Sequence, residues 1–367
     1  MARVSRTRTW SWELAQIAGI RIFVHATFLL LVGWFAIAYW LEVRSLTRVA
    51  SGIALFLLLF ACVLLHELGH ALTAQRFGYP TREITLLPIG GIARLERMPD
   101  DPRESLWITL AGPAVNIAIA AALFVALRAT GTWEPIERGS VISGPFFERL
   151  MLVNLSLVAF NMLPAFPMDG GRALRALLAT RLDDRRATRI AARLGQGMAA
   201  LFALVGWVAN PLLILIALFV WTGAAQEAAM ADMRAALRGI PVAQVMLTAF
   251  RTLAPEDRLS TAIEIVQHGG QRELPVTQGV RPVGLLSRHD LVQALREHGS
   301  QARVADTMDR DILVIAPQDM LDAALSRLDE RQLSAAPVVE NGRLVGLLTA
   351  EAVAEFIKLR AALDHAA

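Results

Sequence analysis

Uninterrupted apolar runs dominate the chain up to about Met230, whereas short apolar stretches alternate with charged residues beyond it. Runs such as Ile53–Leu65 and Leu212–Trp221 are typical of helices that lie in lipid. The alternation that follows them is typical of a soluble domain. The pattern therefore predicts a membrane-embedded first part and a soluble second part, with a boundary near Gly239.

Six segments of the first part are long and apolar enough to be helices that cross a bilayer, which requires about 20 residues per helix. The fifth is the weakest because Arg193 and Gln196 lie in its first turns. A short segment with a helical pattern, Glu227–Arg238, joins the last span to the soluble part. The predicted spans are Ile20–Leu41, Val49–Phe77, Ser105–Arg128, Phe147–Phe166, Ile190–Val208 and Pro211–Ala228.

Composition and charge agree with this division and restrict the partners. The 367 residues are 55% hydrophobic, which is too apolar for an ordinary soluble protein of two domains. The net charge of +3 is spread without blocks of like charge, so no nucleic-acid partner is expected. Arginines are concentrated before the first span and after the second and fourth spans, and this positive-inside bias predicts that both termini and the soluble part are cytoplasmic. The single cysteine, Cys62, excludes a disulfide framework.

A candidate metal site lies in the second predicted span, where the sequence reads His66-Glu67-Leu68-Gly69-His70. Two histidines four residues apart project from one face of a helix and can share a zinc ion. Glu67 then lies where a general base can take a proton from the attacking water. Ionisable groups at membrane depth are costly unless they pair or bind an ion, so a functional site is favoured over a merely satisfied polar patch.

A catalytic zinc ion needs a third protein ligand, and Asp169 is the candidate. It lies in the segment Asn161–Gly171, directly after the fourth span. Pro164 and Pro167 break the helix there, and irregular backbone at that depth is tolerated where it faces protein or a wet cavity. Asp169 also suits the N-cap of a helix over Arg172–Leu182, and the two roles are compatible.

The two motifs together resemble the paired signature of the site-2 protease family of intramembrane metalloproteases. Three further stretches are similar to that family: Gly19–His25, Gly90-Gly91 and Gly112–Asn116. The resemblance covers the membrane part almost throughout, without a PDZ-like insertion. It implies zinc ligands at His66, His70 and Asp169, a catalytic base at Glu67, and a position near the substrate or oxyanion for Asn161.

Four other polar positions in the spans have a structural interpretation first. Cys62 precedes His66 by one helical turn and is expected to be a small buried side chain rather than a ligand. His25 in the first span is expected to hydrogen-bond between helices. Asn116 and Asn154 are expected to join helices by hydrogen bonds.

The stretch Glu83–Leu95 predicts two short strands around a turn at Gly90-Gly91. One interpretation is an ordinary surface hairpin. The other is a substrate-access edge: a protease cannot attack an amide locked in a helix, so a transmembrane substrate must unwind and could pair with an exposed strand. The sequence leaves both interpretations open.

The soluble part is an internal repeat with an offset of 62 residues. Val242-Ala243 recurs as Val304-Ala305, and Gly284-Leu285-Leu286-Ser287 recurs as Gly346-Leu347-Leu348-Thr349. Each unit alternates short strands and helices and is too small to bury a core alone, so the two are expected to pack as a pair.

This repeat resembles a tandem of cystathionine-β-synthase-type (CBS) domains, an α/β pair at 239–300 and 301–367 that follows a protease domain at 1–238. In that family a Gly-x-x-Ser/Thr-x-x-Asp run holds an adenine nucleotide, which implies nucleotide-binding roles for Gly284, Ser287 and Asp290 and ATP as the expected regulator. Ala352 replaces the aspartate in the second unit. The alternative is that the tandem only dimerises the protein.

The sequence therefore predicts a polytopic α-helical membrane protein with a short β-hairpin and a tandem CBS pair. The favoured function is zinc-dependent cleavage of a single-span membrane protein, by resemblance an anti-sigma factor, a membrane-tethered transcription factor or a signal-peptide remnant trimmed first by a site-1-type protease. A homodimer formed through the CBS domains, in the inner (cytoplasmic) membrane of a bacterium, is expected. The rival functions are a CBS-regulated transporter or channel and an inactive scaffold, and the presence of both histidines, Glu67 and Asp169 disfavours the scaffold.

Overall fold

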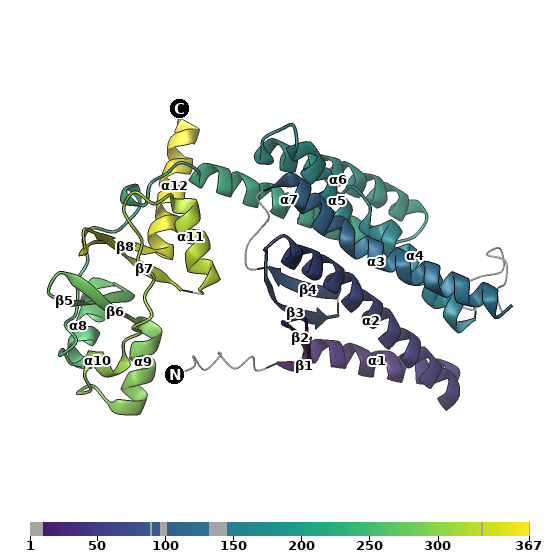
Figure 1. The fold of residues 1–367 in the computed structure, drawn as a ribbon, viewed down its shortest axis with the longest axis horizontal. Helices are drawn as coiled ribbons and strands as arrows, with labels where there is room; N and C mark the ends of the chain where they lie inside the picture. Colours follow the sequence, from purple (N-terminus) through teal and green to yellow (C-terminus); the bar gives the residue numbers. More distant parts are fainter. Residues whose placement is uncertain (1–9, 89, 96–100, 132–144, 332, 367) are drawn as a thin grey trace. The chain divides into compact units, whose positions relative to one another are not determined.

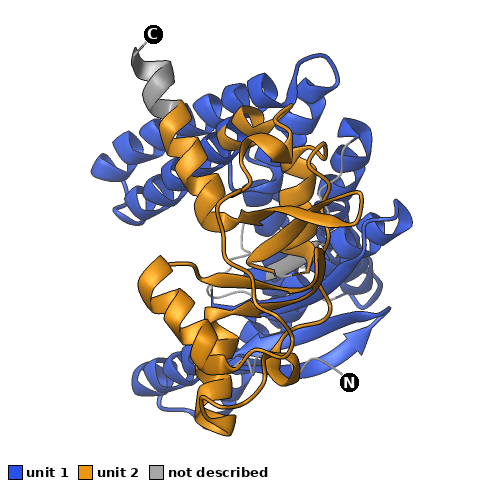
Figure 2. Cartoon of the chain, turned by 90° about the vertical axis from the view of Figure 1, so that its left-hand side faces the viewer, with its two compact units in different colours: residues 1–232 blue, residues 233–367 orange. Residues whose placement is uncertain are grey.

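The computed structural model describes residues 10–88, 90–95, 101–131, 145–331 and 333–366. The chain forms two compact units, residues 1–232 and 233–367 (Figure 2). The first unit contains the long apolar helices and a β-sheet, and the second contains the sequence repeat (Figure 1).

The first unit contains a four-stranded sheet in the order β1-β2-β3-β4. Its strands are β1 (Ser11–Ile17), β2 (Ile20–His25), β3 (Thr81–Leu87) and β4 (Gly90–Leu95). Strands β1 and β2 are antiparallel, β2 and β3 are parallel, and β3 and β4 are antiparallel. The parallel pair is possible because two helices, α1 (Ala26–Val43) and α2 (Leu46–Arg76), connect β2 to β3.

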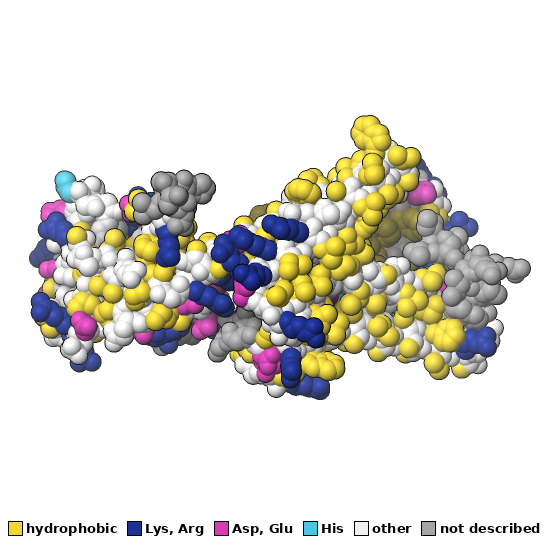
Figure 3. Space-filling model, turned by 90° about the horizontal axis from the view of Figure 1, so that it is seen from above, with side chains coloured by type: hydrophobic (Ala, Val, Ile, Leu, Met, Phe, Trp, Pro, Cys, Tyr) yellow, Lys and Arg dark blue, Asp and Glu magenta, His cyan; other side chains and the backbone are white. Residues whose placement is uncertain are grey.

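The remaining helices of this unit are α3 (Pro102–Ala129), α4 (Phe146–Asn161), α5 (Asp169–Ala179), α6 (Asp184–Val208) and α7 (Leu212–Leu237). Of these, α3 and α4 pack against α2, and α5, α6 and α7 lie on the other side of α3 (Figure 1). Large apolar side chains on their outer faces are exposed, for example Trp34 at 66% and Trp207 at 83%. Figure 3 shows broad hydrophobic faces on this unit. Such faces are suited to lipid rather than to water.

In the described part of the chain, five helices are long and apolar enough to span a membrane: α1, α2, α3, α6 and α7. The predicted fourth span is the exception. Helix α4 ends at Asn161, because the proline-containing segment after it is irregular, and its 16 residues extend about 24 Å. The α-helical membrane architecture is confirmed, and the expected count of six spans is approximate.

The predicted first span was wrong at its N-terminal end. Residues Ile20–His25 form β2, and helix α1 begins only at Ala26. Ile20 and Ile22 are completely buried whereas Arg21 between them is exposed, which is the period-two pattern of a strand. His25 consequently lies at the N-cap of α1, where its Nδ1 accepts from the backbone N–H of Thr27 at 3.3 Å, and does not join two helices as predicted.

The predicted hairpin exists as β3 and β4, but it belongs to the larger sheet rather than standing alone. The turn comes before Gly90, and both glycines lie inside β4. Helix α7 runs to Leu237, so the predicted helical connection Glu227–Arg238 is largely the continuation of the last span.

The second unit contains the repeat twice. The first copy has α8 (Leu259–Gly269), β5 (Glu273–Gln278), β6 (Arg281–Ser287) and α9 (Arg288–His298). The second has α11 (Leu321–Glu330), β7 (Ala335–Glu340), β8 (Arg343–Thr349) and α12 (Ala350–Ala366). The short η1 (Val242–Gln244) and α10 (Val304–Thr307) open the two motifs that recur.

Each copy encloses a buried core that also takes in the opening segment of the other copy: Val304 and Met308 lie in the first core, and Val242 and Val245 lie in the second. A third small cluster also joins the two copies. That cluster packs Leu285 of β6 against Ala335 of β7 and Leu347 of β8. The isolated bridge between Leu253 and Val276 recurs between Ile315 and Val338, at the offset of 62. The two copies therefore pack as a pair, as the repeat predicts.

Candidate metal centre

Helix α2 is held by the sheet on one face and presents its histidines on the other. Leu68 and Ala71 are buried against Ile20 of β2 and Ile84 of β3. At about 100° per residue, His66 and His70 lie on the face roughly opposite to that contact. The sheet therefore fixes the rotation of α2 about its axis and with it the direction of both histidines.

Three side-chain atoms from α2 and α5 form a triangle. His66 Nε2 lies 3.1 Å from His70 Nε2, and Asp169 Oδ2 lies 3.1 Å and 3.2 Å from these two atoms. The three side chains are only 8–12% exposed. A tetrahedral zinc ion with bonds of about 2.0–2.1 Å needs ligand atoms about 3.3 Å apart, so this triangle fits three of its four positions.

Nδ1 of each histidine, the ring nitrogen directed away from the triangle, already makes a hydrogen bond. His66 Nδ1 lies 2.5 Å from Asn116 Oδ1, and His70 Nδ1 lies 2.7 Å from the Ile108 carbonyl oxygen. Both partners are acceptors, so each Nδ1 carries the proton and each Nε2 presents a lone pair. Two lone pairs 3.1 Å apart beside a carboxylate oxygen are unfavourable unless a cation lies between them. The donor set therefore suits a metal ion.

A buried chain of hydrogen bonds continues outward from His66. Asn116 of α3 donates through Nδ2 to Asn154 Oδ1 of α4 at 2.8 Å, and Asn154 Nδ2 contacts Cys62 Sγ at 3.5 Å. Asn116 and Asn154 are completely buried. They do join helices, as the sequence predicts, but Asn116 also orients a candidate ligand, which the sequence did not reveal. Cys62 is buried and is not part of the metal-binding triangle.

Glycines give the helices room to approach the triangle. A Cβ on Gly112 of α3 would collide with His70 Nε2 and lie 2.7 Å from His66 Nε2, in the space that a metal ion needs. A Cβ on Gly171 would lie 2.5 Å from the Ala165 backbone carbon, and Gly170 is equally confined by the backbone of Leu163. Gly170 and Gly171 therefore let α5 start directly against its own preceding loop.

The start of α5 carries Asp169 into the centre. Asp169 is the first residue of the helix rather than its N-cap, which is Met168, and its carboxylate meets the histidines. The preceding loop is fixed by packing, since Ala165 and Met168 are buried against Val220 of α7. Asn161 is the last residue of α4, half-buried, eight residues before Asp169.

Glu67 and strand β4 lie side by side. A Cβ on Gly91 would be 2.6 Å from Glu67 Cγ, so the glycine lets the strand pass directly over the glutamate side chain. Gly91 pairs with Leu86 of β3, and β4 is an edge strand of the described sheet. The structure thus brings Gly90 and Gly91 together with the HExxH helix.

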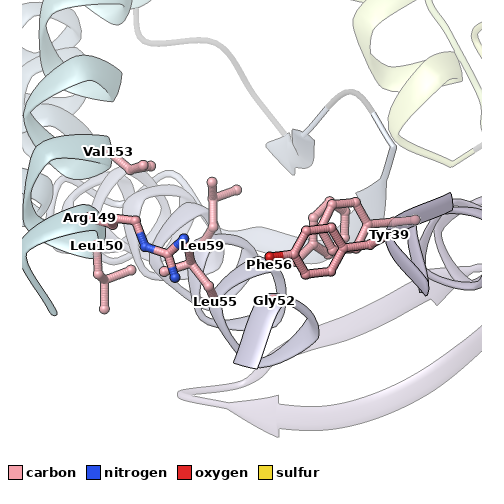
Figure 4. Close-up of a pocket in the computed structure, with 9 residues that line it drawn as sticks. Tyr39, Gly52, Leu55, Phe56, Leu59, Arg149, Leu150 and Val153 are labelled. Atoms are coloured by element: carbon pink, nitrogen blue, oxygen red, sulfur yellow. The ribbon is translucent and has the colours of Figure 1, made fainter. Parts of the chain in front are cut away.

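A separate apolar cavity of about 260 Å³ lies between α1, α2 and α4 (Figure 4). Its lining includes Tyr39, Phe56 and Leu59. Leu59 precedes His66 by two helical turns, and the triangle residues do not line this cavity.

The predicted nucleotide-binding residues have local partners in the second unit. Ser287 caps α9: its Oγ accepts from the Asp290 backbone N–H at 3.1 Å and donates to Asp290 Oδ2 at 2.7 Å. Gly284 is confined by Met308, since a Cβ there would lie 2.5 Å from Met308 Sδ. Thr349 repeats the cap on the backbone N–H of Ala352 at 3.1 Å, without a carboxylate.

An HExxH helix in an apolar bundle, with a buried aspartate completing three ligand positions, defines a membrane-embedded metallopeptidase. Comparison with known proteins gives the same class. The model described as Peptidase family M50 matches residues 54–139 and 136–205, and the CBS domain model matches residues 242–297 and 304–359.

Relatives match over nearly the whole chain. Zinc metalloprotease MJ0392 of Methanocaldococcus jannaschii is 30% identical over 344 residues, which cover 93% of this chain and 94% of the relative. Rip3 of Mycobacterium tuberculosis is 30% identical over 380 residues, which cover 94% and 92%. A solved structure, the site-2 protease from M. jannaschii, is 38% identical with a TM-score of 0.44, covering 60% of this chain and 95% of that one.

The chain belongs to the M50, or site-2 protease, family of membrane zinc metalloproteases, and it carries a tandem CBS pair. The family predicted from the motifs is thereby confirmed, and the chain is a multi-pass membrane protein.

Proposed function

We propose that this protein hydrolyses a peptide bond within the transmembrane segment of a single-span membrane protein. The observation that carries the proposal is the triangle of His66 Nε2, His70 Nε2 and Asp169 Oδ2, with both histidine tautomers fixed for metal binding. These three residues would hold zinc. When bound, zinc supplies a Lewis acid that activates water and polarises the substrate carbonyl.

Glu67 is the proposed general base. It lies one residue after His66 on α2 and beneath Gly91 of β4, so it faces the path of a segment that pairs with β4. Its carboxylate would take a proton from the attacking water and return it to the departing amine nitrogen. Asn161 is proposed to lie near the substrate or the oxyanion, on the resemblance to the family alone.

Strand β4 is the proposed place where substrate becomes cleavable. A transmembrane helix must unwind to expose its amide, and an unwound segment in an apolar environment needs partners for its backbone groups. The edge of β4 could supply these partners by strand addition. The expected substrates are an anti-sigma factor, a membrane-tethered transcription factor or a signal-peptide remnant, first trimmed by a site-1-type protease.

The CBS pair is proposed to be cytoplasmic and to regulate cleavage by binding an adenine nucleotide at Ser287 and Asp290. The arginine bias supports this orientation in the inner membrane. A nucleotide alters cleavage only by its differential affinity for active and inactive forms, typically about 1–3 kcal/mol of coupling. Homodimerisation through the CBS domains is proposed as well. The family membership favours this enzyme over a CBS-regulated transporter or channel.

Co-expression tests the protease directly. Wild type and Glu67→Gln are expressed with candidate single-span proteins, and fragments are compared. Glutamine cannot carry the proton, so we expect at least about a hundredfold slower cleavage with zinc retained. Fragments formed at the wild-type rate by the variant would exclude Glu67 as the base. His66→Ala, which removes a ligand, is the matched control that should lose both zinc and cleavage.

A further inference from the structure

The apolar cavity between α1, α2 and α4 has two polar side chains near the end of the bundle where α1 ends and α2 and α4 begin. Tyr39 lies one turn before the end of α1, and Arg149 lies in the first turn of α4. Gly52 of α2 lets Tyr39 lie close, because a Cβ on this glycine would be 2.6 Å from Tyr39 Cε1. Figure 4 shows the Tyr39 hydroxyl and the Arg149 guanidinium directed toward one another from opposite sides of the cavity.

The walls around these two groups are apolar. Phe35 stacks on Phe56 with ring centroids 5.0 Å apart and on Tyr39 with centroids 5.7 Å apart. Leu59 lies seven residues after Gly52, so the cavity extends about 10 Å along α2. Water would find few hydrogen-bond partners along such walls, and an apolar chain is the better occupant. The rest of the lining consists of Leu55, Leu150 and Val153.

The volume of the cavity restricts the occupant further. The cavity measures about 260 Å³, whereas pockets for drug-sized molecules range over about 300–1,000 Å³. One extended chain suits this space, and a substrate helix about 10–12 Å wide does not. An acidic side chain on a transmembrane substrate would also be costly within the bilayer. A membrane phospholipid, in contrast, carries its negative charge directly beside an apolar chain.

We propose that this cavity binds one acyl chain of an anionic phospholipid, with the phosphate group held by Arg149 and Tyr39. A guanidinium group has five N–H donors, so Arg149 can bind a phosphate in addition to a protein partner. Its planar shape suits bidentate binding of phosphate oxygens, and the Tyr39 hydroxyl adds a further donor. The triangle residues do not line this cavity, so the proposal does not depend on the proposed protease activity.

Native mass spectrometry of the full-length protein in detergent tests the site with three probes: dioleoylphosphatidylglycerol, dioleoylglycerol, which lacks the phosphate, and oleate. We expect the wild type to bind the phosphatidylglycerol at least about tenfold more tightly than dioleoylglycerol, because hydrogen bonds to a charged group contribute that much. Arg149→Gln should reduce this preference at least about fivefold. Arg128→Gln is the matched control, because Arg128 is exposed in the last turn of α3 and does not line the cavity.

A second pair of variants tests the apolar part of the site without removing a charge. Val153→Phe places a larger side chain in the cavity and should weaken binding of both dioleoyl probes at least about fivefold. Leu155→Phe is its control, because Leu155 is 44% exposed on α4 and lies outside the lining. Thermal unfolding and zinc content, measured for each variant, report whether the fold is retained.

Four results would overturn this proposal. Equal affinity of the wild type for the phosphatidylglycerol and for dioleoylglycerol would remove the anionic head group. Wild-type affinities in both Arg149→Gln and Val153→Phe would place the bound lipid elsewhere on the protein. Tighter binding of oleate, in competition with the phosphatidylglycerol, would assign the cavity to a free fatty acid. A co-purified peptide that is lost in Val153→Phe would assign the cavity to substrate.

Discussion

Oδ1 of Asn116 lies 2.5 Å from Nδ1 of His66, and this contact decides which ring nitrogen of His66 faces Asp169. A carboxamide oxygen can only accept, so it fixes the proton on Nδ1 and leaves Nε2 for a metal. A neighbour of this kind commonly contributes ten- to a hundredfold to metal affinity. Asn116 is therefore a positioning residue of the centre, although it does not reach the metal position itself.

The first prediction is that Asn116→Leu, which has similar volume but no acceptor, lowers zinc affinity about ten- to a hundredfold. Chelator competition on the purified full-length protein measures the change, and excess zinc should restore most of the cleavage. Ser156→Ala is the control, since among the described residues the Ser156 hydroxyl donates to the carbonyl of its own helix at Leu152 and has no other partner. Unchanged zinc affinity in Asn116→Leu would contradict the assigned role.

Gly112→Ala should abolish zinc binding at the triangle of His66, His70 and Asp169. The added methyl group would occupy the space between the two Nε2 atoms, so we expect stoichiometric zinc in the wild type and little in the variant. Metal analysis and a thermal unfolding curve are the measurements, the second to show that the helices still assemble. Gly197→Ala is the matched control because its Cβ would meet open space. Full zinc occupancy in Gly112→Ala would place the metal elsewhere.

Proline scanning of β4 tests whether its edge receives substrate. The backbone N–H groups of successive residues in a strand point to opposite sides, so one of Ile92 and Ala93 donates toward β3 and the other toward the open edge. Proline at the outward-facing position should slow cleavage several-fold with zinc retained, and proline at the inward-facing position should disturb the sheet. If both variants cleave at the wild-type rate, β4 is an ordinary hairpin strand.

The carboxyl group of Glu273 should make the second unit less stable as pH rises. Burial raises the pKa of Glu273 in the folded protein above that of the unfolded chain, near 4.3, so folding favours the protonated form. Stability is then lost as pH increases from the unfolded pKa through the folded one. Glu273→Gln should therefore gain stability relative to wild type at pH 8 and lose that advantage near pH 4.

Hydrogen exchange of the amides in β5 and β6, compared between wild type and Glu273→Gln at each pH, measures this difference. The comparison at fixed pH cancels the intrinsic dependence of exchange on pH. A stability difference that does not change with pH would mean that Glu273 titrates as it does in the unfolded chain.

Local sequence motifs were sufficient to predict some residues of the site, but not the contacts that depend on how the helices pack. His66, Glu67, His70 and Asp169 could be named from motifs because their spacing follows one helix and one proline-containing loop. The contact between Asn116 and His66 could not, because it depends on how two helices 50 residues apart pack side by side. Gly112 was visible only as part of a family-like stretch, and its proximity to both histidines required the same packing.

The strand pairings of the sheet could likewise be predicted from the sequence only where the strands are neighbours in the chain. Strand β3 and β4 follow each other and were predicted, whereas β2 pairs in parallel with β3 across two whole helices, and no local pattern specifies such a partner. The apolar run around Ile20 and Ile22 merged with the helix that begins at Ala26, and the strand was therefore assigned to the span.

The buried chain from Cys62 through Asn154 and Asn116 to His66 also bears on how the protein is assembled. Each of α2, α3 and α4 brings its own polar side chains to the apolar bundle. These side chains can hydrogen-bond to one another in only one axial alignment of the helices. A shift by a single turn would leave an amide group without a hydrogen-bond partner in an apolar environment. This alignment uses Nδ1 of His66 and leaves its Nε2 directed at Asp169, so the hydrogen bonds that align the three helices do not themselves require a metal ion.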